Sequence, residues 1–180
     1  MAIISGLLYA ASAARAAAPA PVQDAQARSA QAFVQGFYDW YAWEAQKQDE
    51  GPIGAALKSK RWPSSAAIVS ALKADEEAQA KSPDEVVGID FDPYLNAQDS
   101  CFPYKAGKVT ASGGQYRVEV FDSNCSDPHP EQPTVIAVLE KDGASWRFTN
   151  FIYPGEPGQA DSDLLATLKQ LQQERSKPAD

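Results

Sequence analysis

Apolar positions along this chain repeat with a helical period before Pro83 and with a period of two in the region that follows. Between about Ser29 and Lys47 they recur three or four residues apart, which predicts an amphipathic helix. Six of the twelve residues from 33 to 44 are aromatic. A face so rich in rings needs a large curved surface to pack against, and a wrapped sheet provides one. The rings on this face are Phe33, Phe37, Trp40 and Tyr41, flanked by Trp43.

Further helices follow from the same period. Gly51-Pro52 interrupts the first helix, and leucine or isoleucine recurs at helical spacing in the segments beyond it. The expected elements are a short piece from Ile53 to Lys60, a longer helix with Ser64 or Ser65 as N-cap that ends before Pro83, and a C-terminal helix from Ser162 to Arg175.

Alternation of apolar and polar residues predicts two β-hairpins. The first joins Tyr104–Ser112 to Tyr116–Phe121, and the second joins Thr134–Lys141 to Ala144–Tyr153 through Asp142-Gly143. Helices, then four antiparallel strands, then a helix indicate an α+β fold. The faces expected from alternation are Tyr116, Val118 and Val120 together, and, in the last strand, Trp146, Phe148, Asn150 and Ile152 opposite Arg147, Thr149, Phe151 and Tyr153.

The N-terminal region has the features of an export signal. Residues 1–14 are apolar and small, and cleavage near Ala16-Ala18 satisfies the small-x-small rule. We expect a signal peptide over 1–18, a disordered leader over 19–28 and a single α+β domain over 29–176. The mature protein would then be periplasmic or secreted, with no stable membrane anchor. An uncleaved, alanine-rich leader is the alternative.

The charge balance narrows the classes of partner. The formal net charge is −8, and all 24 acidic residues lie after residue 23. A chain this acidic, without a dense basic cluster, argues against binding to nucleic acid or to anionic membranes. Lys58, Lys60 and Arg61 form one local basic group, which favours a solvated helix end over a phosphate-binding patch. We expect a protein or small-molecule partner, and a monomer or dimer.

Cys101 and Cys125 are the two cysteines of the chain. In an exported protein an even pair favours one structural disulfide, which would contribute roughly 3–4 kcal/mol by closing a loop of about 25 residues. A redox or metal role is less favoured, because there is no Cys-x-x-Cys and the one histidine, His129, lies between two prolines. A Ser-His-Asp triad and a histidine-rich metal site are disfavoured too, and we expect no cofactor and no metal.

Three sequence blocks resemble a known family. Over residues 30–175 the chain is similar to the family called domain of unknown function 3828, which occurs in exported bacterial proteins. The resemblance implies a curved four-stranded antiparallel sheet with the N-terminal helices packed in its concavity and a C-terminal helix, as in cystatin-like and nuclear-transport-factor-2-like cones. It implies no activity, and the anchoring cysteine of lipoprotein members is lacking here. The blocks are Phe-Val-Gln-Gly-Phe-Tyr-Asp-Trp-Tyr at 33–41, Asp-Phe-Asp-Pro-Tyr-Leu-Asn-Ala-Gln-Asp at 90–99 and Trp-Arg-Phe-Thr-Asn-Phe-Ile-Tyr-Pro at 146–154.

Asp90, Asp92 and Asp99 are the acidic residues best placed to form a site. Three carboxylates within ten residues can bind Ca²⁺, although their spacing does not match an EF-hand. The favoured alternative is structural, with Asp90 and Asp92 capping a helix end or accepting hydrogen bonds from backbone amides near Pro93.

Tyrosines extend this set toward a ligand pocket in the mouth of the cone. Asp92 with Tyr94, Tyr38 and Tyr153 would supply a base and hydroxyl donors for proton transfer, or a ligand-binding pocket together with Asp90. Packing of the tyrosines at the rim of the core is the more ordinary interpretation. Among the tryptophans, Trp43 and Trp62 are the surface candidates for stacking on a flat ligand, whereas Trp40 and Trp146 are expected in the core.

Three hypotheses for function follow. The first is an exported, non-catalytic binding or accessory protein, for example an inhibitor or immunity factor whose acidic loop blocks a basic enzyme. The loop from Asp122 to Pro133, which carries Asp127 and Glu131, is the segment that we expect to contact such a partner. The second is a small-ligand-binding or proton-transfer enzyme that uses the cone, and the third is a structural protein of the cell envelope.

Overall fold

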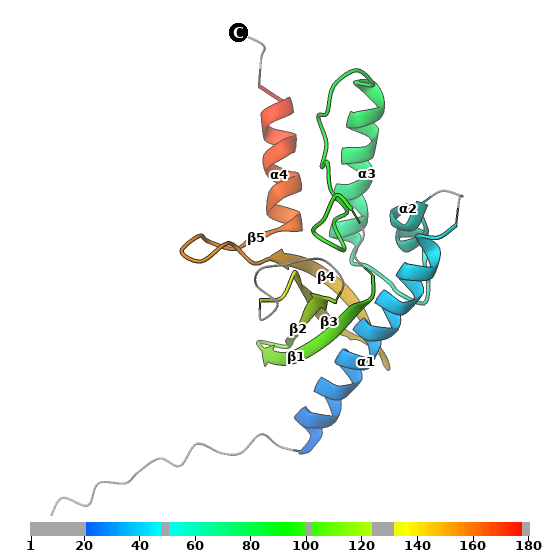
Figure 1. Cartoon of the computed structure of the whole chain (residues 1–180), viewed down its shortest axis with the longest axis vertical. Helices are drawn as coiled ribbons and strands as arrows, with labels where there is room; N and C mark the ends of the chain where they lie inside the picture. The colour runs from blue at the N-terminus through cyan, green and yellow to red at the C-terminus, as the bar shows by residue number, and fades with distance from the viewer. Residues whose placement is uncertain (1–20, 48–50, 100–101, 124–131, 178–180) are drawn as a thin grey trace, which may run out of the picture.

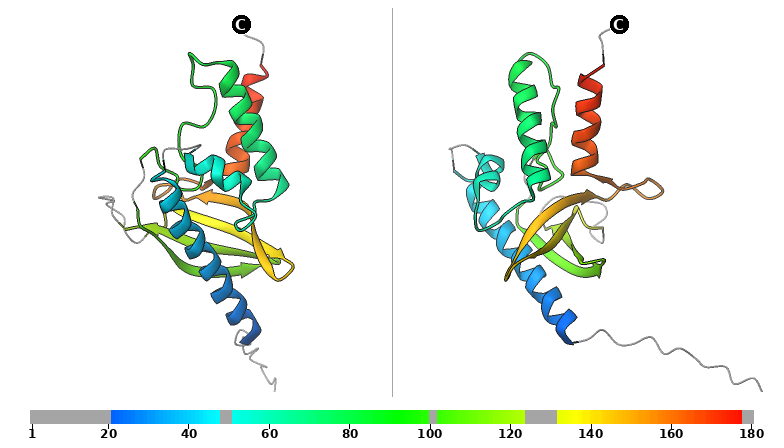
Figure 2. Two further views of the ribbon diagram at one scale, coloured as in Figure 1. Left: turned by 90° about the vertical axis from the view of Figure 1, so that its right-hand side faces the viewer. Right: turned by 180° about the vertical axis from the view of Figure 1, so that it is seen from behind.

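The computed structural model describes residues 21–47, 51–99, 102–123 and 132–177. They form an α+β fold with one antiparallel sheet in the order β1-β2-β3-β4-β5 (Figure 1). The helices are α1 (Pro21–Glu44), α2 (Gly51–Lys58), α3 (Ala66–Lys81) and α4 (Leu164–Arg175). The strands are β1 (Tyr104–Ser112), β2 (Gln115–Asp122), β3 (Val135–Asp142), β4 (Ser145–Tyr153) and β5 (Ser162–Asp163). The helix α1 crosses one face of the curved sheet, while α3 and α4 stand side by side beyond β4 (Figure 2).

The sheet has one strand more than the four expected. Ser162 and Asp163 pair with Tyr153 and Ile152 and so add the short strand β5 to the edge of β4. The C-terminal helix therefore starts at Leu164, not at Ser162 as predicted. Asp163 serves both elements, because its carboxylate also accepts a hydrogen bond from the Ala166 amide at 2.9 Å and caps α4.

The first helix starts earlier than expected. α1 begins at Pro21, eight residues before Ser29, so the disordered leader predicted over 19–28 is wrong for the part that is helical. Contacts with the sheet explain the extension. The Tyr116 hydroxyl donates to Gln26, and the Trp146 indole donates to the Ser29 hydroxyl at 3.0 Å. Tertiary contacts thus stabilise an alanine- and glutamine-rich turn that has no strong apolar stripe of its own.

The aromatic face predicted for α1 is confirmed. Phe37 and Tyr41 are fully buried, and the Phe37 ring lies 4.9 Å from that of Phe148 in β4. Trp62 packs edge-on against Phe33, with the ring centroids 5.1 Å apart. A Cβ at Gly36 would lie 2.8 Å from the Trp62 ring, so this close approach needs glycine at that position. The prediction that Trp62 lies on the surface is therefore wrong.

A β-bulge changes which residues of β4 face the core. Leu139 pairs with Phe148 but Val138 pairs with Asn150, so Thr149 is an extra residue in β4. The alternation predicted for this strand holds before the bulge and fails after it. Phe151 stacks on Phe148 at 5.1 Å, on the same side of the sheet. The core face consequently carries Trp146, Phe148, Phe151 and Tyr153.

Side chains of α1 cover the free edge of β1. The Gln35 amide donates to the Tyr104 carbonyl at 3.1 Å, and its oxygen accepts from the Ala106 amide at 2.9 Å. The Gln31 amide donates to the next carbonyls, those of Ala106 and Gly107, at 3.1 and 2.9 Å. Two glutamines one helical turn apart therefore satisfy backbone groups that a further strand would otherwise pair.

Replacing Phe37 tests the central position of its ring. We expect Phe37→Ala to lower the free energy of unfolding by about 3–5 kcal/mol, since it leaves a cavity between α1 and β4. Trp43→Ala on the same helix is the control, because Trp43 is 56% exposed and should cost less than about 1 kcal/mol. Urea unfolding followed by circular dichroism measures both, and equal losses would contradict the packing described.

The strand ends also bear on the predicted disulfide, although Cys101 and Cys125 themselves lie outside the described residues. The Ser123 amide donates to the Pro103 carbonyl at 3.1 Å, and each of these residues is two positions from a cysteine. We expect the native protein to resist alkylation by iodoacetamide and to take up two adducts after reduction and unfolding. Mass spectrometry measures this, and alkylation of the unreduced, unfolded chain would refute the disulfide.

Candidate functional site

The acid and tyrosine set expected from the sequence does come together, on one side of α1. The Tyr41 hydroxyl donates to Asp92 Oδ2 at 2.7 Å, and the Tyr94 amide donates to Asp92 Oδ1 at 2.9 Å. Tyr38 donates to the Tyr94 carbonyl at 2.7 Å, and Tyr153 donates to the Pro93 carbonyl at 2.9 Å. Three hydroxyls from α1 and β4 thus bind one short loop, residues 92–97, which closes on itself through the Asp92 amide and the Ala97 carbonyl.

Burial sets the protonation states in this cluster. It raises the pKa of the Tyr41 and Tyr38 hydroxyls well above 10, and the nearby Asp92 carboxylate raises both further. Burial also raises the pKa of Asp92 above its ordinary value of 3.8, against the opposing effect of the hydrogen bonds from Tyr41 and the Tyr94 amide. The tyrosines therefore stay protonated and act as donors at neutral pH.

The arrangement favours a structural role for Asp92 over general base catalysis. Each of its oxygens already accepts a hydrogen bond from within the chain. A general base needs a free acceptor within reach of the substrate proton. The structural interpretation given to Asp92 in the sequence, acceptance of backbone amide hydrogen bonds near Pro93, is confirmed, whereas Tyr41, which makes the shortest contact to it, was not among the predicted site residues.

Asp90 lies apart from this cluster. It is exposed, and its Oδ2 accepts a hydrogen bond from the Gln98 amide at 3.2 Å. Asp90, Asp92 and Asp99 are not gathered as Ca²⁺ ligands, and within the described ranges no three His, Cys, Asp or Glu side chains are placed to hold a metal ion.

The loop proposed to meet a protein partner is described only at its ends. Asp122 accepts a hydrogen bond from the Thr134 hydroxyl at 3.0 Å, and so ties the end of β2 to the residue before β3. Asp127 and Glu131 lie outside the described residues, as do the predicted signal peptide and its predicted cleavage site. Among the tryptophans, Trp146 is buried as expected and Trp43 is exposed, with the Lys47 ammonium 3.4 Å from its ring centroid.

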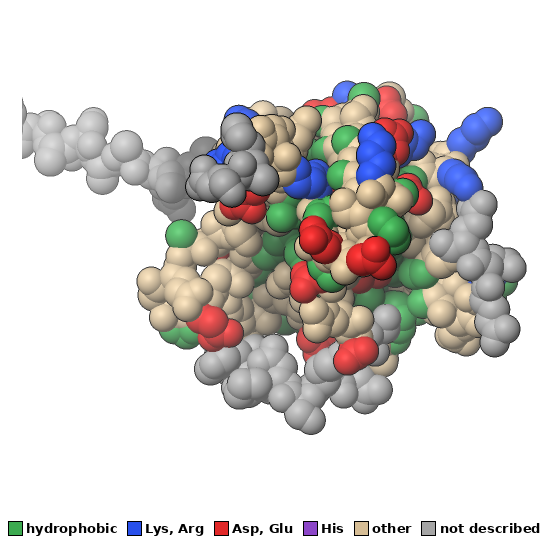
Figure 3. Space-filling view, turned by 90° about the horizontal axis from the view of Figure 1, so that it is seen from above, with side chains coloured by type: hydrophobic (Ala, Val, Ile, Leu, Met, Phe, Trp, Pro, Cys, Tyr) green, Lys and Arg blue, Asp and Glu red, His purple; other side chains and the backbone are tan. Residues whose placement is uncertain are grey.

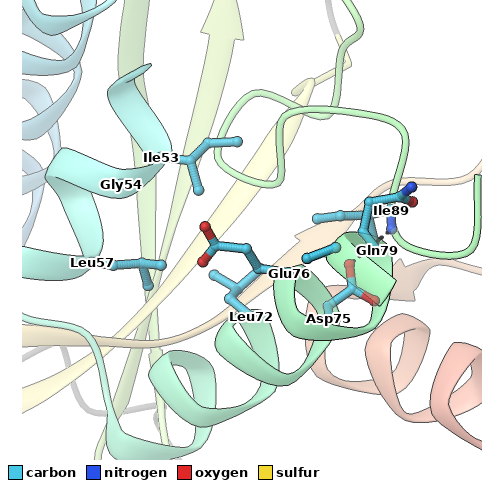
Figure 4. Close-up of a pocket in the computed structure, with 9 residues that line it drawn as sticks. Ile53, Gly54, Leu57, Leu72, Asp75, Glu76, Gln79 and Ile89 are labelled. Atoms are coloured by element: carbon cyan, nitrogen blue, oxygen red, sulfur yellow. Dashed lines mark hydrogen bonds between the residues drawn. The ribbon is translucent and has the colours of Figure 1, made fainter. Parts of the chain in front are cut away.

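A cavity of about 450 Å³ lies elsewhere, between α2 and α3. Ile53 and Leu57 of α2 face Leu72 and Glu76 of α3 across it (Figure 4). Ile89, from the segment after α3, closes the far end, where Asp75 and Gln79 also lie. The full lining is Ile53, Gly54, Leu57, Leu72, Asp75, Glu76, Gln79, Ala80 and Ile89. We call this the α2–α3 cleft.

Asp75 lies at the back of the cleft, and both of its carboxylate oxygens make contacts within the chain. Its Oδ1 lies 2.7 Å from Arg175 Nη1, and its Oδ2 accepts from the Ile89 amide at 2.9 Å. Arg175 also donates to the Val87 carbonyl at 2.7 Å, so the end of α4 and the segment 87–89 are fixed together. A Cβ at Gly88 would lie 2.6 Å from the Asp75 carboxylate, which makes glycine necessary at that position.

This cleft was not predicted from the sequence, although the sequence contains a signal for it. Leu72, Asp75, Glu76 and Gln79 follow one another at helical spacing, so one face of α3 changes from apolar to acidic. Without knowledge of the neighbouring helix, this pattern indicates the solvated end of an amphipathic helix. Only the position of α2, which its pattern does not predict, turns the face into the wall of a cleft.

Comparison with protein-family models, curated proteins and solved structures found no match to this chain. The family resemblance described above therefore stays a prediction. Over the described residues, none of the helices combines the length and the apolar character needed to cross a bilayer.

Asp92 gives a pH dependence with a definite sign. Because its folded-state pKa is raised, the stability that it contributes is present below pH 3.8 and is lost as the pH rises through the folded-state pKa. We expect the free energy of unfolding of Asp92→Asn to increase, relative to that of the native chain, as the pH is raised above 3.8, because asparagine does not ionise. Asp90→Asn, at an exposed carboxylate, is the control, and urea unfolding at each pH measures both. A constant difference for Asp92→Asn would show that Asp92 is not desolvated.

Proposed function

We propose that this chain is a non-catalytic binding protein, exported as its N-terminal residues predict, that takes a small apolar ligand into the α2–α3 cleft. The cleft itself carries the proposal. Its volume of about 450 Å³ lies in the range of small-molecule sites, roughly 300–1,000 Å³. Four aliphatic side chains line it, namely Ile53, Leu57, Leu72 and Ile89.

The alternative, a proton-transfer enzyme using the acid and tyrosines, has less support. Asp92 accepts two internal hydrogen bonds, and Tyr38, Tyr41 and Tyr153 donate theirs to the loop 92–97. In the cleft, Asp75 is likewise paired with Arg175. Asp92 is held to α1 and to its own loop by these contacts and does not line the α2–α3 cleft, so a ligand bound there does not meet it.

Two finer predictions from the sequence stay part of this proposal. The resemblance supports a nuclear-transport-factor-2-like cone, which the curved sheet crossed by α1 resembles in outline (Figure 2). The acidic loop with Asp122, Asp127 and Glu131 remains the expected contact for a protein partner, as in an inhibitor or immunity factor. Asp122 does not line the cleft, and the proposed contact with a protein partner is tested separately from ligand binding.

Binding in the cleft is testable with a neutral apolar fluorophore, N-phenyl-1-naphthylamine. We expect saturable fluorescence enhancement with the native protein, and an affinity at least tenfold weaker with Ala80→Phe, which fills the cleft from an exposed position on α3. Ala74→Phe is the matched control, since Ala74 is exposed on the same helix and does not line the cleft.

Two results would contradict the proposal. The first is no saturable enhancement with the native protein. The second is the same affinity for Ala80→Phe as for Ala74→Phe, which would place the bound fluorophore elsewhere.

A further inference from the structure

The two carboxylates that line the α2–α3 cleft are in different electrostatic situations. Asp75 is 5% exposed and its charge is balanced by Arg175 at 2.7 Å. Glu76 is exposed, its carboxylate extends toward α2, and it has no hydrogen bond or ion pair with any residue that the structure describes (Figure 4). The lining includes no lysine or arginine. The cleft therefore presents one uncompensated negative charge beside an apolar floor.

The end of the helix that carries Glu76 adds little to this charge. The cleft lies along the C-terminal half of α3, and Ala80, one of its lining residues, is in the last turn. The partial negative charge at a helix C-terminus falls off within the last turn, which Glu76 precedes and in which Lys81 lies. A cation in the cleft is thus attracted mainly by the Glu76 carboxylate.

The surrounding surface carries charges of both signs. Seen from above, acidic side chains lie at the centre of this face with hydrophobic side chains between them, and lysine and arginine side chains lie along one side of them (Figure 3). The net charge of the chain is −8. A field of this sign attracts cations toward the cleft and repels anions.

We infer that the ligand of the α2–α3 cleft is a small amphipathic monocation, an apolar chain or ring that carries a single ammonium group. Its apolar part lies among Ile53, Leu57, Leu72 and Ile89, and its ammonium group pairs with the Glu76 carboxylate. A fatty acid or another apolar anion is excluded by the same charges, and a dication finds only one uncompensated partner. This inference rests on the proposed function, because it assigns the chemistry of a ligand for the same cleft.

Displacement of the neutral fluorophore by ligands of equal chain length tests the charge separately from the cleft. The three competitors are n-octylamine, which is protonated at neutral pH, n-octanol and n-octanoate. We expect octylammonium to bind about fivefold more tightly than octanol, which is the effect expected of one partly exposed ion pair. We expect octanoate to bind more weakly than octanol. Raising the salt concentration should reduce the preference for the cation.

Glu76→Gln is the decisive variant, because it keeps the shape of the side chain and removes only the charge. It should bring octylammonium and octanol to the same affinity while the neutral fluorophore binds as before. Glu77→Gln is the matched control, since Glu77 is the next residue of α3, is exposed and does not line the cleft. It should keep the fivefold preference.

The outcomes separate the two proposals. If the fluorophore binds but octanol competes as well as octylammonium, or Glu76→Gln behaves as Glu77→Gln does, the cleft binds ligands and the assigned charge is wrong. If the fluorophore shows no saturable binding to the native protein, the proposed function is wrong and this inference is overturned with it.

Discussion

The packing of the Phe37 ring is the contact on which most of this structure depends. Phe37 meets Trp62, Tyr94 and Phe148, which come from three segments far apart in the sequence. These segments also meet directly, since the Phe148 amide donates to the Pro63 carbonyl and the Tyr94 ring lies 5.1 Å from that of Phe151, but Phe37 contacts all three. The Phe37 ring therefore lies at the centre of one hydrophobic core to which all three segments contribute.

The tyrosines beside Phe37 bind the loop 92–97, which covers one end of the hydrophobic core. The loop 92–97 brings backbone carbonyls and one carboxylate into a largely apolar region, where unpaired polar groups are costly. Tyrosine suits this position because its ring adds to the core while its hydroxyl reaches the loop. The same residues that resemble an acid–base site in the sequence are thus accounted for by the polar groups of one loop.

Much of the fold could be predicted from the sequence, and its exceptions have identifiable causes. The period of the rings in α1, the Asp-Gly turn at 142–143 and the leucine stripe of α4 are local signals, and they predicted the right elements. The bulge at Thr149 left no local signal, so the faces of Phe151 and Tyr153 were reversed. Strand β5 escaped detection because its two residues pair only across the chain with β4.

The candidate site was harder to predict, for a related reason. We expected Asp92 to lie near Tyr38, Tyr94 and Tyr153. Sequence spacing does not specify, however, which groups donate hydrogen bonds to the Asp92 carboxylate. The α2–α3 cleft depends on the relative position of two helices joined through Trp62, whose burial was not anticipated. Patterns within a segment are encoded locally, whereas cavities arise between segments.

The glutamines of α1 have a consequence for the order in which the molecule can form. Gln31 contacts Ala106 in β1, 75 residues later in the chain, and Ser29 contacts Trp146, 117 residues later. α1 contacts α2 and Trp62 soon after it is made, but the sheet that it crosses is complete only when the last hairpin has been made. Contacts of such long range slow folding and leave the growing chain extended. If the protein is exported as proposed, this delay would keep the chain competent for transport across a membrane before it folds.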